Sequence, residues 1–175
     1  GPGSKKHSEA IEKFIKIKKP FVIALNDQKS IKEKYIDIRV ACHTLRLASN
    51  LNRFKKITQP LVMPLKRLSE NQLKDLAKNK ILDYGLELQS GKFIFKKNSA
   101  VMPNSLTICY ALSIANSGKA KTIFISGLDG YPIEDPKRAE MDEVLRLYSV
   151  VKKSTKIISI TPTRYKLKSL SVYAY

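Results

Sequence analysis

The sequence of 175 residues is poor in the features that mark secreted and membrane-spanning proteins. Its two cysteines, Cys42 and Cys109, lie in apolar surroundings and are too few for a disulfide framework. No apolar run approaches the roughly 20 residues that a membrane-spanning helix needs. No secretory signal peptide is visible either. We therefore expect a reduced, cytoplasmic globular domain without a membrane span.

The common motifs of nucleotide and metal sites are also missing. There is no Walker loop, no GxGxxG fingerprint, no HExxH helix and no cysteine cluster. These absences disfavour classical nucleotide hydrolysis, standard dinucleotide binding and structural zinc. We expect no metal and no cofactor.

Acidic residues are few, and basic residues dominate the charge. The chain has 33 Lys and Arg against 15 Asp and Glu, which gives a formal net charge of +18 and predicts attraction to anions. The lysines are scattered, however, and no block reaches five consecutive basic residues. Basic and aromatic residues are weakly interleaved and no RNA-binding motif is present, which disfavours nucleic acid as the partner. A lysine-rich solvated surface with one local phosphate or carboxylate site is favoured.

The first residues differ in character from the rest of the chain. Residues 1–4, Gly-Pro-Gly-Ser, resemble the remnant of a protease-cleaved tag. The remainder starts at Lys5 without an initiating methionine. We expect residues 5–175 to form a single Rossmann-like domain that is a fragment of a longer protein.

Apolar runs and helical spacing alternate along the chain. Short apolar runs predict strands at 21–25, 38–42, 60–65, 122–125 and 157–160. Apolar spacing and capping residues predict helices at 8–19, 43–50, 69–80, 104–116 and 135–151. Segments 84–88 and 92–95 flank a Gln-Ser-Gly turn and predict a hairpin or a paired edge. The alternation predicts an α/β fold, Rossmann-like, with a mostly parallel sheet and helices on both faces.

Polar residues follow several of the predicted strands. In an open parallel sheet, ligands bind beyond the carboxyl ends of the strands, so these residues are the candidates for binding. The candidate ligand-binding residues are Asn26, Asn104, Ser105, Gly127, Asp129, Thr161, Thr163 and Arg164.

Each group of candidates has a functional and a structural interpretation. Asn104 and Ser105 begin a predicted helix, where free amides favour an anion; an ordinary N-cap fits equally. Asp129, between two glycines, suits sugar hydroxyls or a metal, or braces its own turn. Residues 161–165 offer two hydroxyls and a guanidinium that grips a carboxylate, or form a structural turn.

Two residues are candidates for catalysis. His43 follows a predicted strand directly and is a possible general base, although a histidine without a recognisable partner is more often structural. Asp129 is the second candidate base. Cys42 is expected in the core because no histidine-paired nucleophile pattern surrounds it.

Residues 102–131 run from a polar helix start through a long apolar helix and Gly118-Lys-Ala-Lys to a strand and Gly127-Leu-Asp129. This pattern resembles bacterial sialyltransferases and related Rossmann-like proteins. The resemblance implies that Asn104 and Ser105 lie near a nucleotide or sugar acid, with Asp129 close by.

Residues 111–175 contain Ala-Leu-Ser-Ile-Ala, Gly-Leu-Asp-Gly-Tyr and Ser-Ile-Thr-Pro-Thr-Arg-Tyr. This stretch is similar to the C-terminal extension of hydroxymethylglutaryl-CoA-lyase-like aldolases of bacterial surface-polysaccharide loci. The resemblance implies an accessory domain that follows an aldolase domain of the same chain. The metal and pyruvate ligands would lie in that aldolase domain.

These observations lead to one expected function and two alternatives. We expect the accessory domain of a sugar-acid biosynthetic aldolase that binds an anionic sugar or a nucleotide-sugar. The first alternative is a glycosyltransferase-like enzyme that uses a nucleotide-activated sugar, with His43 or Asp129 as its base. The second is a structural domain that forms a homo-oligomer and binds no ligand.

Overall fold

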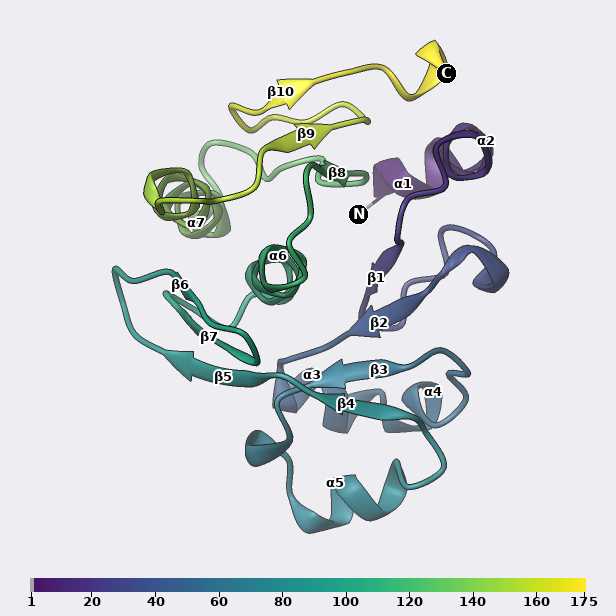
Figure 1. Cartoon of the computed structure of the whole chain (residues 1–175), viewed down its shortest axis with the longest axis vertical. Helices are drawn as coiled ribbons and strands as arrows, with labels where there is room; N and C mark the ends of the chain where they lie inside the picture. Colours follow the sequence, from purple (N-terminus) through teal and green to yellow (C-terminus); the bar gives the residue numbers. More distant parts are fainter. Residues whose placement is uncertain (1) are drawn as a thin grey trace. The chain divides into compact units, whose positions relative to one another are not determined.

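The computed structural model describes residues 2–175 as two compact units. Of these residues, the first unit comprises 2–20, 29–35 and 119–175, and the second comprises 21–28 and 36–118. Figure 1 labels their helices and strands.

The second unit is built on a parallel sheet of four strands in the order β1-β2-β3-β4. The strands are β1 (Ile23–Leu25), β2 (Ile38–Val40), β3 (Leu61–Met63) and β4 (Ile81–Asp83). The connections hold α3 (Thr44–Ser49), α4 (Leu51–Phe54), the 3₁₀ turn η2 (Leu65–Arg67) and α5 (Glu70–Asp75). Every connection joins neighbouring parallel strands, as expected for repeated βαβ units.

Apolar side chains fix the helices to this sheet. Leu61 and Met63 alternate along β3 and join Leu47, Phe54 and Leu76 in one buried cluster. Helix α6 (Thr107–Ser117) packs on β1 and β2, and Figure 1 shows it on the opposite side of the sheet from α5. The sheet is therefore covered on both faces.

A smaller sheet completes the second unit. It contains β5 (Gly85–Leu88), β6 (Ile94–Phe95) and β7 (Ser99–Met102) in the order β5-β7-β6. Of the two alternatives for 84–88 and 92–95, the hairpin is wrong and the paired edge is confirmed, because both segments pair with β7 and form its two edges. β7 was not predicted as a strand, yet its last three residues are buried, so the most buried segment takes the central place.

The first unit carries a parallel sheet of three strands in the order β10-β9-β8. Its elements are α1 (Pro2–Lys6), α2 (Ser8–Lys18), η1 (Glu33–Tyr35), β8 (Ile123–Ile125), α7 (Pro136–Val150), β9 (Ile157–Ser159), β10 (Lys168–Ser169) and η3 (Val172–Ala174). Ile11 and Phe14 of α2 pack with Ile160 and Val172 in its core.

The structure confirms the predicted α/β class with mostly parallel strand pairing, which is compatible with a Rossmann-like fold. Among residues 2–175, only the β6–β7 pair is antiparallel. The strands are distributed over three sheets. The predicted capping box is present, since Ser69 accepts from Gln72 N and the Gln72 side chain accepts from Ser69 N. Pro136 starts α7 behind the Asp135 cap, also as predicted.

Two predicted helices have different ends. Helix α5 stops at Asp75 rather than near residue 80. The Asn79 side chain donates to the carbonyls of Phe54 and Ile57, at 3.2 and 2.9 Å, and holds the chain out of the helical path. Helix α6 starts at Thr107 rather than at Asn104, because the Asn104 side chain forms a local turn ahead of the helix.

Candidate functional site

The predicted site residues fall into two groups, one in each unit. Asn26, His43, Asn104 and Ser105 belong to the second unit. Gly127, Asp129, Thr161, Thr163 and Arg164 belong to the first.

In the second unit, Asn26 links the carboxyl end of β1 to the start of α6. Its side-chain Oδ1 accepts a hydrogen bond from the Thr107 hydroxyl at 3.4 Å, and its backbone N–H donates to Val40 O at 2.8 Å. The residue has φ 54°, a left-handed conformation that asparagine tolerates better than most residues. Only 7% of Asn26 is exposed. The turn after β1 therefore holds this amide in one place beside α6.

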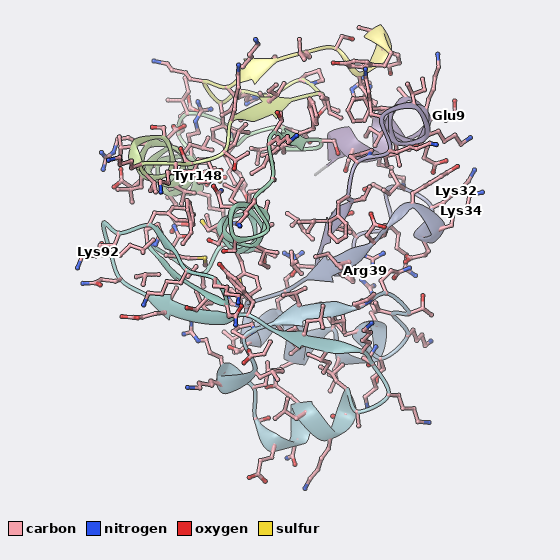
Figure 2. The ribbon with its side chains drawn as sticks, in the orientation of Figure 1. Glu9, Lys32, Lys34, Arg39, Lys92 and Tyr148 are labelled. Atoms are coloured by element: carbon pink, nitrogen blue, oxygen red, sulfur yellow. The ribbon has the colours of Figure 1, made fainter. Side chains whose placement is uncertain are left out.

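A buried arginine supports the same turn. Arg39 of β2 is 1% exposed, and its Nη1 donates to the carbonyls of Asn26 and Gln28 at 3.1 and 2.8 Å (Figure 2). Arg39 was not among the predicted site residues, because it stands in the middle of an apolar strand. Its contacts make it a positioning residue for the Asn26 turn.

Several hydrogen-bond donors around Asn26 have no acceptor within residues 2–175. These are the Asn26 amide nitrogen and the backbone N–H groups of Thr107 and Ile108. In the same range, Asn79 Oδ1 is the one side-chain N or O atom that is fully buried without a partner. The Asn26 nitrogen therefore reaches the surface, beside the positive end of the α6 dipole.

Asn104 does not act as the first residue of α6. Its Oδ1 accepts from Leu106 N at 3.2 Å and from the Cys109 thiol at 3.4 Å, which forms a side-chain turn ahead of the helix. Leu106 is the N-cap residue and makes no side-chain cap bond. Because this local turn competes with helical geometry, the free amides lie at Thr107 and Ile108, further along the chain than the sequence predicted.

Ser105 contacts the end of β2. Its carbonyl accepts from the Cys42 thiol at 3.3 Å. Burial raises the pKa of Cys42 to about 11, although the Thr107 hydroxyl and the charge of Arg67 act in the opposite direction. The thiol is therefore protonated near neutral pH and serves as a donor, not as a nucleophile.

Charges of both signs lie at this edge of the sheet, since Asp83 ends β4 and its carboxylate accepts from Leu65 N at 3.0 Å. Arg67, at the end of η2, is exposed and acts electrostatically on Cys42. The nearest carboxylate on the Asn26 turn, Asp27, is paired with Arg53 at 3.0 Å. Burial raises the pKa of Asp27, but hydrogen bonds from Arg53 and the backbone, together with the charges of Arg53 and Arg46, outweigh it and leave the pKa below its usual value. This carboxylate is ionised and neutralised by Arg53.

His43 caps helix α3. Its Nδ1 accepts from Arg46 N at 3.4 Å, which requires that the ring proton be on Nε2. A general base at Nε2 would need that nitrogen free of its proton, so capping and base catalysis compete. Beside His43 lies a small, mostly apolar gap in the packing whose lining includes Ala41, Leu47, Met63 and Pro64, and it has no room for a water molecule. This gap is therefore part of the packed interior and not a binding cavity.

In the first unit, the loops after β8 and β9 are bound to each other. Gly127 N donates to the Thr161 hydroxyl at 2.8 Å, and Arg164 N donates to Asp129 O at 2.9 Å. Thr161 is 3% exposed and Gly127 is buried, so these two residues shape the loops from inside. The two loops lie together because β8 and β9 are parallel neighbours and end at the same sheet edge.

The remaining candidates of this group reach the surface. Arg164 is exposed, and its guanidinium has no partner within residues 2–175. Thr163 accepts from Tyr165 N at 3.2 Å. The Asp129 Oδ2 accepts from Gly3 N at 2.8 Å, and a side chain at position 3 would collide with this carboxylate. The Asp129 carboxylate therefore accepts a backbone N–H in this structure.

Residues 2–175 contain no cluster of three or more His, Cys, Asp or Glu side chains that would hold a metal ion. Within that range, no helix has both the length and the apolar character to cross a bilayer.

Comparisons with known proteins found no match to this chain among protein-family models, curated proteins or solved structures.

Proposed function

We propose that this chain binds an anionic sugar or nucleotide-sugar at the carboxyl edge of the β1–β4 sheet, and that it does so as an accessory domain in surface-polysaccharide biosynthesis. The observation that carries the proposal is the cluster of unused donors at one point. The Asn26 amide nitrogen and the N–H groups of Thr107 and Ile108 have no acceptor within residues 2–175, and a hydrogen bond joins Asn26 to Thr107, the neighbour of Ile108.

The chemistry of the cluster favours an anion. Amide N–H groups at a helix start donate to phosphate or carboxylate oxygens, and the helix dipole favours the negative charge. Arg67 adds a positive charge nearby, and Arg53 neutralises Asp27, which would otherwise repel an anion. A phosphate or carboxylate that carries a sugar or a base suits an edge that offers several N–H donors to the anion.

The experiment is a thermal-shift screen followed by calorimetric titration. Candidate ligands are inorganic pyrophosphate, CMP- and UDP-linked sugars and free sugar acids, since a ligand that binds only the folded state raises the melting temperature. Asn26→Asp keeps the side-chain size, the left-handed backbone and the acceptor for Thr107, but replaces the donor with a negative charge. A hydrogen bond to a charged group contributes about 1.5–3 kcal/mol, so the variant loses roughly tenfold or more in affinity.

Asn98→Asp is the matched control, because Asn98 is an exposed loop residue of the same unit and undergoes the same change of charge. The control is expected to bind as the parent does. Failure of every ligand class, or equal affinity of Asn26→Asp and the parent, would refute the proposal. Concentration-dependent association without ligand binding would instead support the structural alternative.

A further inference from the structure

A second basic feature belongs to the first unit, whereas the residues of the proposed anion site belong to the second. Helix α2 and the segment 29–35 each present lysines to solvent. We call this surface the lysine face and define it by Lys13, Lys16, Lys18, Lys19, Lys32 and Lys34, all of which are exposed.

Tertiary contacts bring the two segments together. The Glu12 carboxylate accepts from Lys32 N at 3.0 Å and pairs with Lys32 Nζ at 3.4 Å. Lys16 and Lys34 approach the same Tyr35 ring, with Nζ 5.9 and 5.3 Å from its centroid. Figure 2 shows Lys32 and Lys34 projecting outward on the same side as Glu9 of α2. Lysines that are scattered in the sequence therefore share one face.

Most of the charge on this face is not neutralised. Lys32 is the one lysine of the face that forms an ion pair within residues 2–175. The other carboxylates on these segments are Glu9 and Glu33. Five ammonium groups without ion pairs, spread over two segments, suit a partner with repeated negative charges better than a single small anion.

Aromatic rings accompany the lysines. Lys18 Nζ lies 4.7 Å from the centroid of Tyr175, so the C-terminal 3₁₀ turn η3 borders α2. Tyr173 of η3 is 66% exposed, and its hydroxyl is 2.8 Å from His7 Nδ1. The Tyr173 ring also contacts the His7 ring edge-on, with 5.7 Å between the centroids. Because η3 packs against α2, which carries three of the lysines, the exposed part of the Tyr173 ring provides a stacking surface for a base on the same unit.

A lipid surface fits less well. The apolar side of α2 is occupied, because Ile11 and Phe14 are buried in the unit core. Ile17, 52% exposed, is the large aliphatic side chain that α2 leaves outside. Insertion into a bilayer interface requires a broad apolar face, which this helix already uses for folding.

We infer that the lysine face binds the phosphodiester backbone of a single-stranded nucleic acid. Lysine binds phosphate as a point charge and does not distinguish one base from another. Segments 2–20 and 29–35 contain no arginine, the residue that recognises bases through two parallel hydrogen bonds. Binding is therefore independent of base sequence and strongly dependent on salt. The inference stands apart from the proposed sugar site, which lies in the other unit.

Fluorescence anisotropy with labelled single-stranded RNA and DNA of about 20 nucleotides measures this interaction. Titrations from about 50 to about 300 mM NaCl give the slope of log K against log salt. The double variant Lys16→Gln/Lys34→Gln is expected to lower the magnitude of that slope by about 1.4, since each phosphate contact on a single strand contributes about 0.7. Lys92→Gln/Lys97→Gln, at two exposed lysines of the second unit, is the matched control and keeps the parent slope.

Two further arms identify the partner. Tyr173→Ala is expected to weaken single-stranded binding several-fold and to leave duplex binding unchanged, because bases in a duplex are not free to stack. Vesicles of phosphatidylcholine and phosphatidylserine test the lipid alternative by co-sedimentation. Absence of binding at low salt, an equal loss in the Lys92/Lys97 control, or binding to vesicles in place of nucleic acid would overturn the inference. None of these outcomes alters the result expected for Asn26→Asp.

Discussion

Replacing Thr161 by valine removes one hydroxyl from the interior of the first unit and changes the side-chain shape very little. The hydroxyl accepts a 2.8 Å hydrogen bond from Gly127 N, and both residues are buried. In the variant this N–H has no acceptor and no access to water. A buried donor left without a partner costs about 1–3 kcal/mol, so we expect the free energy of unfolding to fall by that amount.

Hydrogen exchange measures this loss of stability locally, at the amides around Gly127. Loss of about 1–3 kcal/mol corresponds to roughly 5- to 150-fold faster exchange of amides that open with the β8 turn. Mass spectrometry of peptides spanning 123–131 measures that rate, and urea unfolding monitored by circular dichroism measures the global change. Thr161→Ser retains the acceptor and is expected to keep most of the protection at Gly127.

The result that would refute this reasoning is specific. If Thr161→Val and Thr161→Ser lose the same protection in 123–131, a general loosening of the packing around position 161, and not the Gly127 hydrogen bond, explains the change. Unchanged exchange in Thr161→Val would show that the Gly127 amide has another acceptor or reaches water.

Two further predictions concern backbone conformation and thiol chemistry. Gly130 has φ 91°, and a Cβ there would lie 2.8 Å from Arg164 Cβ, whereas Gly91 has φ 71° with nothing within 4 Å. Gly130→Ala is therefore expected to lower the free energy of unfolding by about 1–3 kcal/mol. Gly91→Ala introduces backbone strain of about 1 kcal/mol without a collision, so its loss is expected to be smaller. Equal losses of the two variants in urea unfolding would contradict the collision at Gly130. Burial raises the pKa of Cys42 to about 11, so iodoacetamide should alkylate it slowly at neutral pH and progressively faster as the pH rises toward that value. Because the folded pKa of Cys42 lies above the unfolded value of about 8.5, the neutral thiol contributes fully to the free energy of unfolding below that unfolded value. This contribution is lost as the pH rises through the folded pKa. Comparing the pH dependence of the urea midpoint between the parent and Cys42→Ala measures the loss.

The predictions from sequence differ in success for identifiable reasons. The capping box at Ser69 and the Asp135-Pro136 helix start were predicted because their hydrogen bonds join residues two or three apart. The start of α6 was misplaced, because the Asn104 side chain forms a turn that helical spacing does not reveal. The expected hairpin failed for a different reason: β7, later in the chain, takes the place between its two strands.

The residues of the candidate site also divide into those that the sequence predicted and those that it did not. Asn26 was predicted because polar residues after buried strands lie at the edge where ligands bind. Arg39 and Thr107 were missed, since one lies within an apolar strand and the other within an apolar helix. Their roles arise from contacts with Asn26 across 13 and 81 residues of chain. No local pattern specifies contacts of that length.

The sequence by itself determined the α/β class, most of the helices and strands, and the strong positive charge, because these depend on apolar periodicity, on caps and turns, and on composition. Tertiary structure alone decided the order of strands around β7 and the contact of Lys16 and Lys34 with the same Tyr35 ring. It decided as well that the free N–H groups at the start of α6 are those of Thr107 and Ile108. It also decided that Thr161 faces the interior, where its hydroxyl binds Gly127, while Arg164 faces solvent. The physical reason is the same in each case. Burial and hydrogen bonding between distant residues fix the environment of a side chain, and the position of a residue along the chain does not specify which distant groups it meets.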